Sequence, residues 1–260
     1  MPTVDPPSAA VFTKSSPTHP RSYPAEAAGL AWLANAGPGS ARVVQVLDVR
    51  PESISLQRLT PTAPTRAAAA VFGRALVRTH AAGAAHFGSG PDGWRGDGFI
   101  GRQELSLAPQ APWGAFYADQ RLLPYAEQAA RLQHLSRGGL NAVHRVCGRL
   151  HAGDWDDDRS PARIHGDLWT GNVVFTAAGV VLIDPAAHGG HPLTDLAMLE
   201  LFGAPHLAAI TGAYAEEAGL SPGWRDLIGL HQLHPLLVHA ASHGPAYGRQ
   251  AAAVALEYRS

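Results

Sequence analysis

The sequence predicts an α+β fold with two lobes: a small mixed lobe over residues 1–60 and a larger, mainly helical lobe over residues 61–260. Runs of β-forming residues are concentrated in the first 60 positions, whereas helical patterns fill most of the remaining chain. The chain has 260 residues, of which 46% are hydrophobic, so it can bury a sizeable core. No internal repeat is visible.

The small lobe contains three predicted strands and one helix. Residues 11–14 (Val-Phe-Thr-Lys) end a short β-like run, residues 43–49 are a second strand candidate, and residues 53–56 are a third. Residues 27–34 repeat apolar positions at helical spacing, and Glu26 stands at the start of this helix. The order is therefore strand, helix, strand, strand.

The larger lobe begins after Pro61 and Pro64, which break regular structure. A helix is predicted over residues 66–82, followed by a Gly-rich stretch over residues 83–112 that is too long for a simple connector. Two more helices are predicted, over residues 113–135 and 139–151. The first of these three helices has its apolar face at Val71, Phe72, Ala75, Leu76 and His80.

After residue 185 the chain is predicted to be entirely helical. Asp195 can begin a helix that continues to Phe202, and three more helices follow. Each of these three opens with a proline at or near its first turn, where a missing N–H costs little. They cover residues 205–219, 222–241 and 245–258.

The most informative segment runs from residue 165 to residue 185 and reads H-G-D-L-W-T-G-N, an apolar hairpin, and I-D-P. It places Asn172 five residues after Asp167, and Asp184 twelve residues after Asn172. The two apolar β-forming runs between Asn172 and Asp184 predict a hairpin that returns Asp184 to the side of Asn172. A lone H-G-D triplet is usually only a turn, but the whole ordered set favours a functional site.

This set of side chains has a physical rationale in phosphoryl transfer. The reaction depends on positioning the acceptor oxygen and on neutralising phosphate charge. Mg²⁺ takes oxygen ligands, usually one or two carboxylates and an amide carbonyl beside the phosphates. The spacing predicts a phosphotransferase that uses ATP and Mg²⁺, with Asp167 accepting the proton of the attacking hydroxyl and with Asn172 and Asp184 as metal ligands.

Lys14 is the only lysine in the chain, and 19 of the 20 basic residues are arginine. It ends the first predicted strand, where a kinase lobe carries the lysine that contacts the α- and β-phosphates. A compact ammonium suits this role better than a guanidinium fork. We expect Lys14 to pair with Glu26; the alternative is an isolated surface lysine and a glutamate favoured in the first turn of a helix.

The chain resembles the fructosamine kinase (ketosamine 3-kinase) family. The resemblance is carried by H-G-D-L-W-T-G-N, by I-D-P-A, and by G-G-H-P-L-T-D-L-A-M-L-E-L-F-G. Trp169 within the loop and the segment from Asp195 to Gly203 make the match more specific than a general phosphotransferase pattern. Three further stretches are similar: G-F-I-G with Gln103, W-G-A-F-Y-A-D-Q-R, and G-W-R followed by L-H-P-L-L-V-H. Together they span the chain from about residue 11 to its end.

This resemblance implies a protein-kinase-like fold and an ATP-dependent kinase that phosphorylates a sugar hydroxyl of a ketoamine, either a small glycated amine or a glycated protein lysine, in deglycation. It further implies roles for individual residues. Main-chain groups of Gln57, Arg58 and Leu59 would meet the adenine edge, and Trp169 would shape the acceptor pocket. His165 and Asp195 would support the catalytic loop. The stretch over residues 83–112, with Phe99, Gln103 and Trp113, would cover the acceptor cleft. By residue type alone, Trp113, Phe116 and Tyr117 are more typical of the core than of ligand contacts.

One feature departs from the family pattern. Only thirteen residues precede Lys14, and residues 1–10 contain no glycine. A kinase lobe normally begins with two strands and a glycine-rich loop whose N–H groups bind the phosphates. We therefore expect a shortened lobe with weaker nucleotide binding and an exposed apolar sheet face or edge. Either translation starts upstream of Met1, or part of the nucleotide clamp has been lost.

Two other functions remain open at this point. The acceptor could be an aminoglycoside, a choline-like molecule or another small alcohol, or the chain could be a nucleotide-binding pseudokinase. A polycationic acceptor is usually met by an acidic cleft, but the last 56 residues carry only four acidic side chains, which favours a neutral sugar. These are Glu216, Glu217, Asp226 and Glu257.

Composition predicts an ordinary cytoplasmic enzyme. The net charge of −1 gives no broad field that would attract nucleic acid or a membrane, and the N-terminus lacks a secretion signal. Cys147 is the only cysteine and falls on the apolar stripe of its helix, which predicts an inert buried thiol. We expect a monomer or weak dimer without the disulfide link that family members with a cysteine near the phosphate loop can form.

Overall fold

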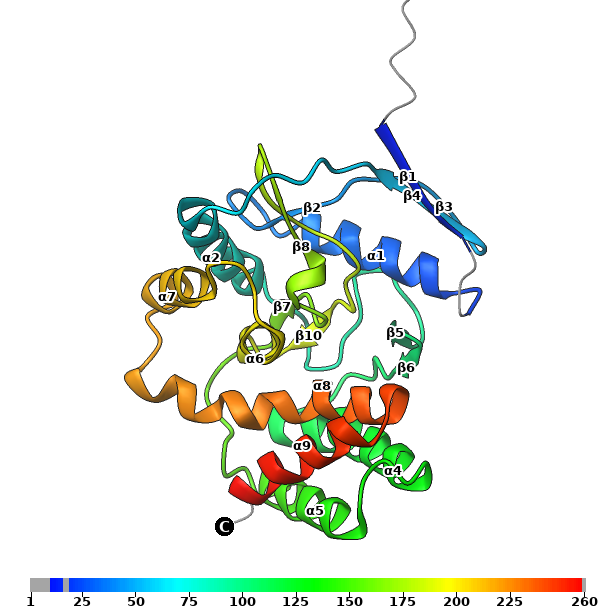
Figure 1. Cartoon of the computed structure of the whole chain (residues 1–260), viewed down its shortest axis with the longest axis vertical. Helices are drawn as coiled ribbons and strands as arrows, with labels where there is room; N and C mark the ends of the chain where they lie inside the picture. The colour runs from blue at the N-terminus through cyan, green and yellow to red at the C-terminus, as the bar shows by residue number, and fades with distance from the viewer. Residues whose placement is uncertain (1–9, 16–18, 259–260) are drawn as a thin grey trace, which may run out of the picture.

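The computed structural model describes residues 10–15 and 19–258, arranged as a small sheet region above a helical region (Figure 1). The small region contains a three-stranded antiparallel sheet in the order β1-β4-β3, with α1 packed on one face. Leu30 of the helix meets Ile54 and Leu56 of the central strand in a small apolar core. The elements are β1 (Val11–Ser15), α1 (Ser22–Ala34), β3 (Val46–Arg50) and β4 (Ser53–Gln57).

The register of this sheet explains why the face away from α1 can be exposed to solvent. Thr13 pairs with Ser55, and Asp48 pairs with Ser55 from the other side, so the face away from α1 is largely polar. The exposed apolar side chains lie on the two outer strands of the sheet. They are Val11, Phe12, Leu47 and Val49, each 40–46% exposed. The expectation about the segment before Ala10 lies outside the described residues.

A second sheet joins the two regions. β8 (Val173–Thr176) and β9 (Gly179–Leu182) form the predicted hairpin, and β2 (Arg42–Val43) adds to β9 in parallel. The strand predicted over residues 43–49 is thus two strands that belong to different sheets. Because β2 pairs with a strand of the later sequence, backbone hydrogen bonds cross the predicted boundary at residue 60, and the division into two lobes there stays a prediction.

Helix α2 (Arg66–Ala81) begins where the sequence predicts, with the Thr65 side chain accepting a hydrogen bond from the amide of Ala68. It packs against α7 (Leu207–Ala218). Phe72 and Leu76 are buried as expected, but Val71 is 59% exposed, so its assignment to the apolar face was wrong. Val71 directly precedes Phe72, and neighbouring helical residues point about 100° apart, which turns its side chain outward.

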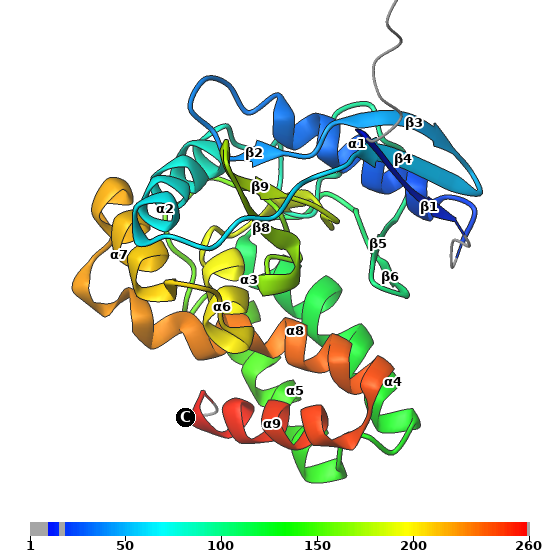
Figure 2. The same cartoon turned by 45° about the horizontal axis from the view of Figure 1, so that its top comes forward.

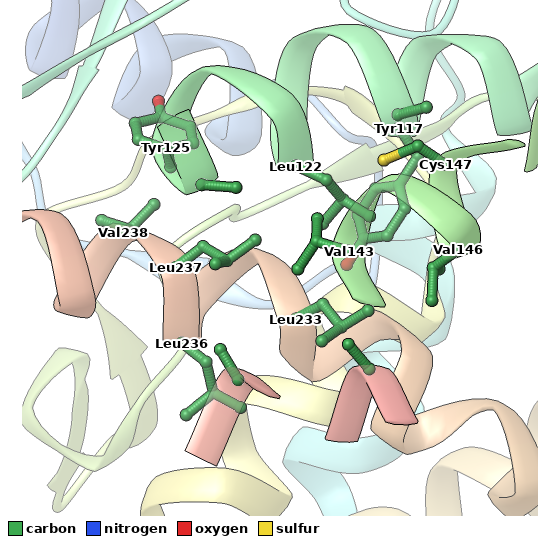
Figure 3. Packing of buried hydrophobic residues seen from close by; sticks show 14 of the residues in the cluster. Tyr117, Leu122, Tyr125, Val143, Val146, Cys147, Leu233, Leu236, Leu237 and Val238 are labelled. Carbon is green, nitrogen blue, oxygen red and sulfur yellow. The ribbon is translucent and has the colours of Figure 1, made fainter. Parts of the chain in front are cut away.

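Helices form most of the rest of the molecule, and among the described residues their buried side chains form two clusters, of which Figure 3 shows part of the larger. Leu122, Val143 and Leu233 come from three different helical segments of this cluster, and Cys147 is buried among them as predicted. The helix predicted over residues 113–135 is three segments, with a π-helical stretch in the middle. The helical segments are α3 (Trp113–Phe116), the π-helix (Tyr117–Leu122), α4 (Leu123–Arg131), α5 (Arg137–His151), α6 (Leu193–Phe202), α8 (Ile228–His243) and α9 (Pro245–Glu257).

Two short β pairs escaped prediction. The stretch over residues 83–112 contains a hairpin of β5 (Gly98–Ile100) and β6 (Gln103–Leu105). β7 (Ala162–Ile164) pairs with β10 (His188–Gly190), which corrects the expectation that the chain after residue 185 is all helix. A Cβ on Gly189 would lie 2.2 Å from the His86 carbonyl oxygen, so this glycine allows close backbone approach, whereas a Cβ on Gly190 would meet the side chain of Ile164 at 2.4 Å. None of the helices in the described ranges is long and apolar enough to cross a membrane.

Candidate active site

The turn after β7 holds the loop that the sequence predicts to be catalytic. Gly166 has φ +79°, and a Cβ there would lie 2.3 Å from the carbonyl oxygen of Ala186, so only glycine fits. Asp167 follows it and is half-buried. Burial raises the pKa of Asp167 to about 7, opposed by a hydrogen bond from Asn172 and assisted by the nearby negative charges of Asp184 and Asp195.

Asn172 connects the two aspartates of the motif. Its Nδ2 donates to the main-chain oxygen of Asp167 at 2.8 Å, to Oδ2 of Asp167 at 3.1 Å, and to the main-chain oxygen of Asp184 at 3.4 Å. The Ile183 amide donates back to the carbonyl oxygen of Asn172 at 3.2 Å. The predicted hairpin therefore brings Asp167, Asn172 and Asp184 together.

Lys14 reaches this cluster from β1. Its Nζ lies 2.7 Å from both carboxylate oxygens of Glu26 and 2.8 Å from Oδ1 of Asp184. The predicted Lys14–Glu26 ion pair is thus present. Burial acts to lower the pKa of Lys14, but the two carboxylates outweigh it and the pKa is raised, so the side chain is an ammonium at neutral pH. Asp184 has φ +53°, an unusual conformation for a residue other than glycine.

One cavity of about 330 Å³ gathers the predicted catalytic, metal and acceptor residues. Phe99 lines it as expected, together with Trp94, which the sequence did not single out. Gln103 and Trp113 do not line this cavity. Gln103 is hydrogen-bonded to Gln128, and Trp113 is buried in the core. The predicted site residues that line the cavity are Lys14, Glu26, Asp167, Trp169, Asn172 and Asp184.

Trp169 is 40% exposed and forms part of the cavity wall. Its ring lies over Gly171, where a Cβ would approach it to 2.4 Å, so the glycine is required for this ring position. Phe202, at the end of α6, meets the ring edge-on with centroids 6.5 Å apart. These contacts leave part of the indole open to the cavity.

Gln57, Arg58 and Leu59 line a different cavity from the catalytic residues. Two of their main-chain amides already have partners, since the Gln57 amide donates to Gln45 and the Arg58 amide to Ala10. The structure therefore does not bring these three residues together with Asp167 and Asp184, and contact with an adenine ring stays a prediction.

The carboxylate of Asp195 accepts hydrogen bonds from the backbone of the loop that contains Asp167. Its Oδ1 accepts from the Gly166 amide at 2.9 Å and its Oδ2 from the His165 amide at 2.8 Å. Oδ2 also lies 3.0 Å from Nε2 of His80, whose Nδ1 lies 2.8 Å from the hydroxyl of Tyr214. Burial alone would raise the pKa of Asp195, but these partners outweigh it and the pKa is lowered.

His165 is held in one neutral form. Its Nδ1 accepts from the Asp167 amide at 3.2 Å, so Nε2 carries the proton and donates to the carbonyl of Ile183 at 2.9 Å. Complete burial lowers the pKa of His165, in agreement with a neutral imidazole. The ring thereby connects the start of the loop to the residue before Asp184.

His80 and Tyr214 are the supporting residues that sequence reasoning missed. His80 was assigned to an apolar helix face, and it is indeed buried, but it pairs with Asp195 rather than with hydrocarbon. A histidine among buried helix positions is a signal that a polar partner is near. Nothing local in the sequence connects it with Tyr214, which lies 134 residues further on.

Comparison with known proteins agrees with this geometry. A family model described as fructosamine kinase matches residues 4–258. A protein from Enterococcus faecium named as a probable ketoamine kinase is 30% identical over 177 residues, which cover 68% of this chain but only 62% of that protein. The chain therefore aligns with less than two thirds of that relative's length.

Solved structures extend the comparison. A Thermobifida fusca protein assigned as a fructosamine-3-kinase is 42% identical, with a TM-score of 0.86 over 95% of this chain and 85% of the other. The gentamicin complex of the aminoglycoside phosphotransferase APH(2")-IIa has a TM-score of 0.59 at 11% identity, over 96% of this chain and 86% of that one, which shows a shared fold alone. The fold is the protein-kinase-like α+β fold that the sequence predicts.

Proposed function

The chain belongs to the fructosamine kinase family, and on that premise we propose that it transfers the terminal phosphoryl group of ATP to a sugar hydroxyl of a ketoamine. The observation that carries the proposal is the convergence of Lys14, Asp167, Asn172 and Asp184 on one cavity. Their types match the requirements of phosphoryl transfer, because the set combines a proton acceptor, two oxygen ligands and a cation.

Asp167 acts on the acceptor. Its carboxylate binds the attacking hydroxyl and accepts its proton as the oxygen bonds to phosphorus and the bond to the leaving diphosphate breaks. A general base works best when its pKa lies close to the operating pH, and the raised pKa of about 7 meets that condition. The hydrogen bond from Asn172 keeps the carboxylate in a fixed orientation.

Lys14, Asn172 and Asp184 act on the phosphates. The second carboxylate oxygen of Asp184 and Oδ1 of Asn172 fit Mg²⁺, which commonly takes one or two protein oxygens and completes its shell with phosphate and water. The ion would neutralise charge on the phosphates. Lys14, fixed by Glu26, supplies a second positive charge in the same cavity.

The wall of the cavity suits a sugar with an organic substituent. Trp94, Phe99 and Trp169 offer aromatic faces, and such faces also attract the cationic secondary amine of a ketoamine. We propose that the acceptor is a small ketoamine or a glycated lysine and that the reaction serves deglycation. The scarcity of acidic side chains in the last 56 residues disfavours an aminoglycoside.

The test is ATP consumption with Mg²⁺ and a panel of acceptors: a fructosyl amine, its unglycated parent amine, an aminoglycoside and choline. Mass spectrometry of the fructosyl amine should show an added phosphate, and the parent amine should stay unchanged. If the aminoglycoside or choline were turned over faster than the fructosyl amine, the proposed ketoamine acceptor would be wrong. If Mg²⁺ and ATP raised the melting temperature without phosphate transfer to any acceptor, the chain would be a nucleotide-binding protein instead.

A further inference from the structure

Two further cavities, of about 700 and 260 Å³, adjoin one another and share no lining residue with the active-site cavity. Their common wall is the loop Gly39–Arg42 and Ala178 in the turn of the β8–β9 hairpin. Helix α2 closes the smaller cavity, and residues 57–60 border the larger one. Figure 2 shows β2, α2 and this hairpin grouped at one side of the molecule.

The side chains around these cavities carry an uncompensated positive charge. Four arginines line them, Arg42 in both, and no aspartate or glutamate does. Arg78 pairs with Glu217 at 3.1 Å, and Arg58 donates to the carbonyl of Val11 at 2.9 Å. The side chains of Arg42 and Arg74 make no hydrogen bond or ion pair with any residue in the described ranges. Like charges gathered without counter-charges repel one another, and a bound anion removes that repulsion.

Arg42, Arg74 and Arg78 line the same small cavity. Arg74 and Arg78 are four residues apart and therefore share one face of α2. Arg78 donates to the carbonyl of Gly39 at 3.4 Å, and the Ala41 amide donates to the hydroxyl of Thr79 at 2.9 Å, which fixes the loop against that face. These two bonds flank the loop just before Arg42.

The smaller cavity also has an apolar side. Val71 is the most exposed large hydrophobic residue among the described parts of the chain, and it lines this cavity with Ala75 and Val180. A planar guanidinium binds phosphate through paired hydrogen bonds, more strongly than it binds a neutral acceptor. The combination of guanidinium groups and an apolar wall fits a phosphate monoester with an organic group attached.

We propose that the cavities around Arg42 and Arg74 form a second ligand site, separate from the active site, for a small organic phosphate. Arg42, Arg74 and Arg78 hold the phosphate group, and Val71 contacts the organic part. The proposal stands independently of the acceptor used in the active site.

Hydrogen–deuterium exchange tests it by location. The intact protein is titrated with inorganic phosphate, with AMP and with adenosine at constant ionic strength. AMP and phosphate should both slow exchange in residues 37–42 and 176–180, and AMP should do so at a lower concentration than phosphate. Adenosine should not slow exchange in these residues. Because phosphates also enter the active site, and because residues 57–59 are predicted to contact adenine, protection of residues 57–59 and 165–172 is counted separately.

Two double variants make the test quantitative. In the double variant with Arg42→Gln and Arg74→Gln, the AMP concentration that gives half-maximal protection of residues 37–42 should rise about tenfold or more. Arg137→Gln with Arg145→Gln removes the same charge from the exposed side of α5 and should leave it unchanged. Protection confined to residues 57–59 and 165–172, equal protection by adenosine, or equal AMP affinity in both double variants would each overturn the proposal.

Discussion

The sheet region and the helical region supply different halves of the active site and are held together differently. Around α1 and β4, a small cluster containing Leu30, Ile54 and Leu56 is the core, and the outer strands leave apolar side chains exposed. The helical region has a large continuous core and a catalytic loop fastened by Asp195. Lys14 belongs to the first region, and Asp167 to the second.

This difference indicates a division of labour. Residues in the well-packed region should set the rate of chemistry, because their positions are fixed by many buried contacts. Residues of the sheet region should mainly set nucleotide affinity, because Lys14 is held by charged side chains rather than by a large core. The predictions below separate the two contributions.

The largest effect is expected at the catalytic carboxylate. Asp167→Asn keeps the shape but removes the proton acceptor, so kcat should fall by about 10² to 10⁴ while the KM for ATP changes little. Steady-state kinetics with the fructosyl amine measures both. Asp158→Asn, an exposed position in a loop, is the matched control. Wild-type turnover in Asp167→Asn would remove this carboxylate from the mechanism.

The second largest effect is expected from acid, which should lower the free energy of unfolding of the helical region. Burial lowers the pKa of five fully buried histidines of this region, that of His188 to about 3. Below the unfolded pKa of about 6.5 the unfolded chain binds protons that the folded chain excludes, so stability present above pH 6.5 is lost as the pH falls. The five are His165, His188, His191, His231 and His234.

At pH 6 each excluded proton costs about 0.8 kcal/mol, so the five histidines together cost up to about 4 kcal/mol relative to pH 8. The pKa values of Asp167 and Glu26, both raised to about 7, act in the opposite direction, because the folded chain takes up protons that the unfolded carboxyls release, and they offset about 1.4 kcal/mol each. Urea unfolding at the two pH values gives the difference. Hydrogen exchange should show the loss in helices α5 and α8 as well as globally. If the unfolding free energy increased by the full amount of about 2.7 kcal/mol expected of the two carboxyls alone, the buried imidazoles would not be excluding protons.

The support behind the catalytic loop should give a smaller loss. His80→Ala leaves the fully buried carboxylate of Asp195 without its imidazole partner, which should cost about 2–4 kcal/mol in unfolding free energy and lower kcat. His80→Gln can still donate a hydrogen bond and should recover part of both. His144→Ala on the exposed side of α5 is the control. If Ala and Gln at position 80 behaved alike, the hydrogen bond to Asp195 would be unimportant.

The sequence predicted the parts of the site that depend on local spacing. Asp167, Asn172 and Asp184 belong to one loop and one hairpin, so their convergence follows from short-range structure. The pair of Lys14 and Glu26 was also predictable, because a strand and the next helix carry them. The fold class followed from the same patterns and from the family resemblance.

The parts that failed depend on contacts between distant segments. His80 meets Asp195 across 115 positions, and β10 lies where Gly189 lets its backbone approach that of His86 closely. Gln57 donates its amide to the carbonyl of Gln45, in the segment between β2 and β3, and its contact with a nucleotide stays a prediction. No periodicity or spacing in the sequence records such pairings, because they are decided by packing of the whole chain.

The smallest effect is expected in the sheet region. Glu26→Gln weakens the anchor of Lys14 without creating a cavity, so the KM for ATP should rise about tenfold while kcat changes less than twofold. The Lys14 ammonium keeps Asp184 as its partner, which explains why the loss is limited. Glu52→Gln, exposed in the turn between β3 and β4, should leave both constants unchanged. A fall in kcat as large as that of Asp167→Asn would show instead that the sheet region shares control of the chemical step.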